Sequence, residues 1–217
     1  MKETVFTEGG HRFLYRQNEL ENVPLVILAA HRESTEQLME ACARPLDILV
    51  CLDLDWDADL SPWPSKPVIS KEDDFKGYGF ELAKDFEKAL SHVPETRKSC
   101  IIVAGYSMGG LFALYAPYFI NNLYGIAAAS PSVWYPDFYE YIDTNPYPYS
   151  ITRISLSLGD RESCHSNPYL KTTETVLRKL DQLYVSRNIS CSFRLDPGDH
   201  FTQPDKRLAA CIATVLK

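Results

Sequence analysis

The segment "VAGYSMGG", residues 103–110, holds a serine between two glycines, with Gly105 two residues before Ser107 and Gly109 two residues after it. The residues before Gly105 are apolar and typical of a buried strand, and those after Ser107 follow a helical pattern. A strand that turns directly into a helix projects the corner residue away from the sheet, and this strained turn needs small neighbours. The sequence therefore predicts Ser107 as an exposed nucleophile, with the backbone N–H of Met108 as an oxyanion donor.

A serine hydroxyl is a poor nucleophile unless a base removes its proton, so the histidines decide whether this prediction is coherent. The chain has five. His200 stands in "DPGDH", a Pro/Gly loop that follows the last apolar strand-like run, residues 189–197. A loop at the carboxyl end of that strand lies at the same edge of a parallel sheet as Ser107. We therefore predict that His200 is the general base, in preference to the histidines at positions 11, 31, 92 and 165.

The third member of such a site is an acid that orients the histidine, on a loop leaving a strand between the serine and the histidine. The segment "SLGDRES" supplies Asp160 and Glu162 in one turn after the strand-like run 153–159. Position alone leaves both carboxylates open. With either acid, the expected chemistry is attack of Ser107 on an ester carbonyl, with no cofactor required.

Apolar strand-like runs alternate with amphipathic helix-like segments along the chain, which predicts a mostly parallel sheet covered by helices on both faces, a three-layer α/β fold. An antiparallel hairpin around "TEGGH" precedes this pattern. Strands are expected near residues 24–30, 46–54, 99–105, 125–130, 153–159 and 189–197, and helices near 34–43, 75–93, 108–119, 168–187 and 204–217, with Ser34 and Gln37 forming a capping box at the first helix.

Composition limits the alternatives. A chain of 217 residues with 45% hydrophobic residues can bury one core, so we expect a single domain over residues 1–217. A formal charge of -7 and the absence of any Lys/Arg-rich run argue against a nucleic-acid partner. No apolar stretch is long enough for a membrane span or resembles a signal core, so a cytoplasmic protein is expected. Six cysteines without a C-x-x-C pair indicate reduced thiols and no metal site, and the oligomeric state is left open.

With these residues assembled, the chain resembles the esterase D-like family of the α/β-hydrolase superfamily, which includes feruloyl esterases, siderophore esterases and S-formylglutathione hydrolases. The resemblance covers most of the chain and is carried by "VAGYSMGG", "ASPSVWY", "DLSPWP", "LGDRE" and "PGDH". It implies an α/β-hydrolase fold and a serine esterase. In the family the acid stands three residues after a glycine, so the resemblance assigns it to Glu162, three residues after Gly159.

One segment departs from the family pattern. The family usually has His-Gly after its third strand, whereas this chain has His31 and Arg32 in "LAAHRES". The resemblance implies that the Arg32 N–H is the second oxyanion donor. His31 itself is expected to be a packing residue.

The substrate is expected to be a small ester. The insertion between the strands that end near Ser130 and begin near Arg153 is too short for a large helical cap, but it is rich in aromatic residues. We expect Trp134 and Tyr135 to line an open site that prefers short-chain or aryl esters, with activity falling beyond roughly eight acyl carbons. A thioesterase or acyltransferase with the same triad, and a non-catalytic binding protein with a hydrolase fold, are the alternatives.

Overall fold

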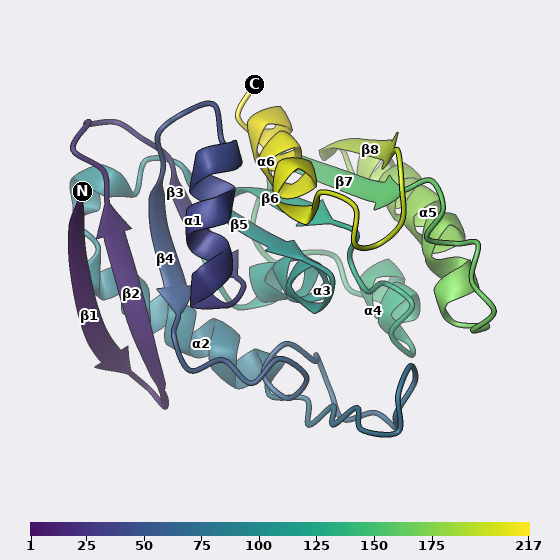
Figure 1. Ribbon diagram of the computed structural model, residues 1–217. Coiled ribbons are helices and arrows are strands. Elements are labelled where there is room, and N and C mark those ends of the chain that lie inside the picture. Colours follow the sequence, from purple (N-terminus) through teal and green to yellow (C-terminus); the bar gives the residue numbers. More distant parts are fainter.

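The computed structural model describes residues 1–217 and contains one eight-stranded sheet with helices on both faces (Figure 1). The strand order is β1-β2-β4-β3-β5-β6-β7-β8. β1 and β2 form an antiparallel hairpin, β2 is antiparallel to β4, and all other neighbouring strands are parallel. The strands are β1 Lys2–Glu8, β2 His11–Gln17, β3 Leu25–Ala29, β4 Asp47–Cys51, β5 Ile101–Tyr106, β6 Leu123–Ala129, β7 Arg153–Gly159 and β8 Ser190–Asp196.

Six α-helices form the outer layers: α1 Arg32–Ala41, α2 Gly79–Ala89, α3 Met108–Tyr115, α4 Phe138–Thr144, α5 Thr173–Ser186 and α6 Pro204–Val215. α1 and α6 pack together on one face of the sheet over a core of 17 buried residues, and the other four helices cover the opposite face over a larger core of 40 (Figure 1). Because both faces are covered, β3 and β4 are apolar along nearly their whole length and fully buried. The three-layer α/β-hydrolase fold without a large cap domain is thus confirmed. No helix has both the length and the apolar character that a membrane crossing requires.

The parallel strands bring their carboxyl ends to one edge of the sheet. β5, at its centre, ends directly before Ser107, and β6 ends before Ser130. The loop after β7 carries Glu162, and the loop after β8 carries His200. Four side chains that are far apart in the sequence therefore meet above the sheet.

The starts of three helices differ from the sequence-based expectations: those of α1, of α2, and of α5, which begins at Thr173 instead of near residue 168. α1 begins at Arg32, and Ser34 makes no side-chain cap hydrogen bond, so the predicted capping box is wrong. α2 begins at Gly79 instead of near residue 75, because Gly77 has a φ of 80° and the chain before it runs alongside Pro64. The insertion before β7 contains the short helix α4.

An ion-pair cluster attaches the hairpin to the rest of the fold. The His11 ring lies 3.0 Å from the carboxylate of Asp85 on α2 and 3.6 Å from that of Asp59. Asp85 also accepts a hydrogen bond from the Gly10 N–H and one from the Lys88 ammonium. The carboxylates of Asp59 and Asp85, opposed by burial, raise the pKa of His11 to about 9.

This raised pKa predicts a pH-dependent stability. The protonated form of His11 stabilises the fold fully below its ordinary pKa of 6.5, and that contribution is lost as pH rises through about 9. The unfolding free energy of the wild type should therefore fall between pH 6 and pH 9.5 by up to about 3 kcal/mol more than that of His11→Gln. Urea unfolding at both pH values tests this. His92→Gln, which removes an exposed histidine paired with Glu8, is the control and should keep the wild-type dependence.

Candidate active site

Ser107 stands at a strained turn between β5 and α3. Its φ of 57° and ψ of -122° are a sparsely populated combination for a residue with a side chain. The turn is possible because the flanking backbone approaches closely: a Cβ at Gly105 would lie 2.1 Å from the Gly109 carbonyl oxygen, and one at Gly109 would lie 2.0 Å from the Ala29 carbonyl oxygen. Neither position therefore has room for a side chain. This confirms the prediction that the turn needs small residues on both sides of Ser107.

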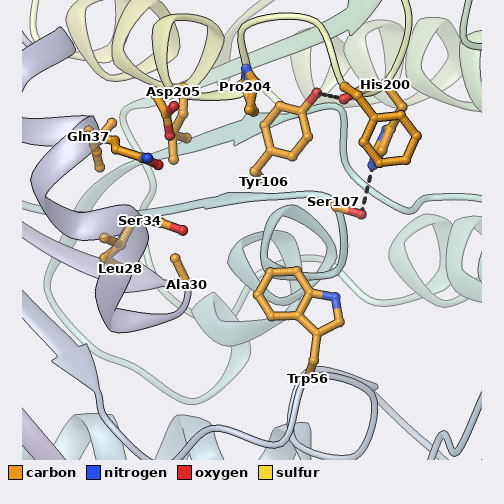
Figure 2. A pocket seen from close by; sticks show the side chains of 13 residues that line it. Leu28, Ala30, Ser34, Gln37, Trp56, Tyr106, Ser107, His200, Pro204 and Asp205 are labelled. Atoms are coloured by element: carbon orange, nitrogen blue, oxygen red, sulfur yellow. Dashed lines mark hydrogen bonds between the residues drawn. The ribbon is translucent and has the colours of Figure 1, made fainter.

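A chain of hydrogen bonds links the three predicted residues. His200 Nε2 lies 3.1 Å from Ser107 Oγ, and His200 Nδ1 lies 2.7 Å from Glu162 Oε2. Figure 2 shows the imidazole pointing at the serine hydroxyl from the loop before α6. The arrangement has the geometry of a nucleophile, a base and an orienting acid.

The two candidate acids have different contacts in the structure. Asp160 Oδ1 accepts a hydrogen bond from the Gly198 N–H and does not contact the histidine ring. Glu162 is 7% exposed at its side chain, and its second oxygen, Oε1, accepts hydrogen bonds from the Ser130 hydroxyl and the Gly159 N–H. Burial raises the pKa of Glu162, but the hydrogen bonds from His200, Ser130 and Gly159 outweigh burial and hold this pKa below its usual value. Glu162 is thus built to stay ionised.

Two residues that the sequence analysis missed support this group. The Tyr106 hydroxyl donates to the carbonyl oxygen of His200 at 2.5 Å, and burial is the main cause that raises the Tyr106 pKa. The Arg207 guanidinium lies 2.8 Å from Glu162 Oε1. Tyr106 is visible inside the "GYSMG" motif, but nothing in the helical segment "PDKRLAA" separates Arg207 from a surface arginine.

The two predicted oxyanion donors occupy equivalent places. Met108 is the first residue of α3 and Arg32 the first of α1, so neither backbone N–H has a partner within its helix. Both helices begin at the edge of the sheet that carries Ser107, and the start of α3 touches the end of β3 at Ala29. The N-terminal N–H groups of two helices favour negative charge there. Their roles as oxyanion donors stay predictions.

Two cavities meet at Ser107, and His200 and Phe201 line both of them. The first, of about 360 Å³, lies between α1 and α6 and is shown in Figure 2. Its walls include Trp56, whose ring stacks on His31 with centroids 4.9 Å apart. The second, of about 330 Å³, lies on the side of Glu162.

Of the two aromatic residues predicted to bind substrate, Trp134 and Tyr135, only one lines a cavity. Trp134 lines the second cavity. Tyr135 lines neither: it is 2% exposed, its hydroxyl donates to the Trp63 carbonyl oxygen, and its ring packs edge-on against Phe75. The expectation for Tyr135 is therefore corrected, because the residue after Trp134 points into the core. Phe201, 87% exposed at the mouth of both cavities, is an aromatic wall that the sequence analysis missed.

No group of three or more His, Cys, Asp or Glu side chains is arranged to hold a metal ion. All six cysteines are free thiols: Cys51 and Cys211 are buried and Cys164 is exposed. The described site consists of the hydrogen-bonded serine, histidine and glutamate with their supporting groups.

Comparison with solved structures shows the same fold in serine hydrolases. An IroE-like serine hydrolase from Shewanella oneidensis matches with a TM-score of 0.73 and 12% identity over 98% of this chain and 79% of that one. The siderophore hydrolase EstB from Aspergillus nidulans matches with a TM-score of 0.70 and 18% identity over 99% and 94%. A capsule O-acetyltransferase of Neisseria meningitidis serogroup A matches with a TM-score of 0.62 and 14% identity over 98% and 94%. No protein-family model and no curated protein matches the sequence.

Proposed function

We propose that the protein is a serine esterase that hydrolyses small carboxylic esters through an acyl-enzyme. The observation that carries this proposal is the pair of hydrogen bonds from Ser107 Oγ to His200 Nε2 and from His200 Nδ1 to Glu162 Oε2, at 3.1 and 2.7 Å. The fold shared with serine hydrolases supports it.

In the proposed reaction, His200 Nε2 takes the proton of Ser107 as its Oγ attacks the ester carbonyl carbon. The negative charge that develops on the carbonyl oxygen is met by the backbone N–H groups of Met108 and Arg32. His200 then passes the proton to the leaving alcohol, so an acyl-serine and a free alcohol remain. Water, deprotonated by His200, then attacks the acyl-serine; the bond from the acyl carbon to Ser107 Oγ breaks, His200 returns the proton to Oγ, and the acid is released. Glu162 stabilises the imidazolium that forms in both halves.

Labelling with a fluorophosphonate probe tests the proposal directly. The probe forms a covalent adduct only with an activated serine, and we expect a single adduct on the peptide that contains Ser107. Heat-denatured protein is the control and should not label. Absence of labelling in the folded wild type would favour a non-catalytic binding protein.

The proposed substrates are short-chain or aryl esters. Both cavities are at the small end of the range for ligand pockets, and each is bounded by an aromatic side chain, Trp56 in the first and Trp134 in the second. A long aliphatic chain would leave most of its length in water. Trp134, 7% exposed, offers a flat apolar surface to the part of an ester that enters the second cavity.

A series of p-nitrophenyl esters should therefore show highest kcat/KM with acetyl to octanoyl groups and a fall for longer chains. Trp134→Ala should lower kcat/KM for aryl-acyl esters by about tenfold, because it removes roughly 1–2 kcal/mol of apolar contact. Tyr149→Ala, in the same insertion but exposed and outside both cavities, is the matched control and should behave as wild type. A maximum with palmitate, or equal effects of the two substitutions, would contradict this substrate assignment.

Acyl transfer is the second candidate function, and the structural likeness to an O-acetyltransferase favours considering it. The same acyl-serine would then pass its acyl group to an alcohol instead of water. Adding increasing concentrations of a sugar alcohol or glycerol during turnover distinguishes the two. Hydrolysis as the dominant fate predicts unchanged acetate release, whereas a transferase would yield the acetylated alcohol with a matching loss of acetate.

A further inference from the structure

We propose that Arg207 is a positioning residue of the site: it fixes one oxygen of Glu162, anchors the histidine loop, and through its charge affects the pH range in which the site is active. This inference rests on the proposed function, since it concerns the same serine, histidine and glutamate. Arg207 is only 4% exposed and lies in the first turns of α6. A cation near a helix N-terminus faces the positive end of the helix dipole, so this placement does not serve to stabilise α6.

The guanidinium is surrounded by acceptors from four segments of the chain. Nη1 donates to Glu162 Oε1 at 2.8 Å, to the Ser130 hydroxyl at 3.2 Å and to the Tyr106 hydroxyl at 3.3 Å. Nη2 donates to the carbonyl oxygens of Asp199 at 2.8 Å and Pro197 at 3.1 Å. Arg207 therefore connects the acid to two backbone carbonyl groups of the loop that leads to His200.

The space for this group depends on a glycine. A Cβ at Gly159 would lie 2.8 Å from Arg207 Nη2 and 2.9 Å from Nη1. Gly159 also donates its N–H to Glu162 Oε1. Gly159, at the end of β7, thus leaves room for the Arg207 guanidinium and also binds the Glu162 carboxylate.

The two oxygens of Glu162 have different hydrogen-bond partners. Oε1 accepts from Arg207, Ser130 and the Gly159 N–H, whereas Oε2 accepts only from His200 Nδ1. Three donors on one oxygen prevent rotation of the carboxylate, so Oε2 stays aligned with the imidazole. A planar guanidinium is suited to this because its several N–H groups point in fixed directions.

The positive charge of Arg207 has a second effect. When His200 takes the proton of Ser107 it becomes a cation, and a buried cation on the far side of Glu162 disfavours that charge. Removing the Arg207 charge should therefore move the acidic limb of the kcat/KM profile to higher pH. The Arg207 variants retain the other charged or titratable groups that face His200 and its loop. These groups are Glu162, Tyr106, Asp199, Arg161, His165 and Asp205.

The test compares Arg207→Met, Arg207→Gln and Arg207→Lys in two measurements: the pH profile of kcat/KM with p-nitrophenyl acetate, and the NMR titration of the His200 ring. In the two neutral variants we expect the acidic limb of the kcat/KM profile to move up by about one pH unit, with the His200 ring signals following the same direction, and the maximal kcat/KM to fall by about tenfold or more. In Arg207→Lys the maximal kcat/KM should fall, but the acidic limb of the profile should stay at its wild-type pH. Arg207→Gln retains a hydrogen-bond donor and decides the question if Arg207→Met does not fold.

Arg97→Gln is the matched control, because Arg97 is a similarly buried arginine that pairs with Asp47, which lies at the amino end of β4. It should leave the limb at its wild-type pH. An unmoved limb and titration in the neutral variants, or an equal shift in Arg207→Lys, would overturn the inference. A wild type that neither hydrolyses esters nor labels would instead refute the proposed function, and the NMR titration would still report on the Arg207 charge.

Discussion

Replacing Ser107 with alanine is expected to lower hydrolysis of p-nitrophenyl acetate by about 10⁴- to 10⁶-fold, because the acyl-enzyme cannot form without the Oγ nucleophile. The fold should be unaffected. Alanine keeps the Cβ, so the strain of the positive φ at position 107 is the same in both proteins, and the hydroxyl makes hydrogen-bond contact only with His200 and Ser132. The midpoint of thermal unfolding should therefore change by only a degree or two.

Ser132→Ala is the matched control for this substitution. Ser132 Oγ lies 3.5 Å from Ser107 Oγ and is buried in the same site, but no histidine activates it. We expect this variant to keep most of its activity and to label normally. If Ser107→Ala retained more than a few per cent of the activity, or if the label appeared on Ser132, the nucleophile would have to be reassigned.

The sequence allowed much of this site to be predicted because its features are local. Gly105 and Gly109 are required because backbone atoms a few residues away or on the neighbouring strand leave no room for a side chain. The sequence motif therefore predicts the turn directly. The position of His200 followed from a general property of parallel sheets, whose carboxyl ends share one edge. The three-layer arrangement could be predicted because strands that are apolar along their whole length must be covered by helices on both faces of the sheet.

The features that could not be predicted depend on contacts between distant segments. Arg207 approaches Glu162 across 45 positions of sequence, and an arginine in an amphipathic helix gives no sign of being buried. Tyr135 follows a cavity residue but lies in the core because Trp63 and Phe75 enclose it, and neither is its neighbour in sequence. α1 begins at Arg32, after an extended His31 that makes no side-chain cap hydrogen bond, so no capping pattern in the sequence marks its start.

Glu162→Gln is expected to lower kcat by about 10²- to 10⁴-fold, a larger loss than removing one hydrogen bond would cause. Arg207, Ser130 and the Gly159 N–H all donate to Oε1, so the carbonyl oxygen of the new amide must take that place. Its NH₂ group is then left facing His200 Nδ1. An NH₂ donor requires Nδ1 to be an acceptor, which puts the ring proton on Nε2. In that tautomer His200 cannot take the proton of Ser107.

Asp160→Asn gives the comparison that assigns the acid. Asp160 Oδ1 accepts from the Gly198 N–H, and an asparagine oxygen can accept the same hydrogen bond, so we expect activity within a few-fold of wild type. Steady-state kinetics of both variants, with circular dichroism to show that each is folded, measures the difference. Equal losses, or a larger loss in Asp160→Asn, would move the acid to Asp160. If instead Glu162→Gln loses activity and its NMR spectrum shows the His200 ring proton on Nε2, the three donors on Oε1 are the cause, because they alone fix which end of the amide faces the histidine.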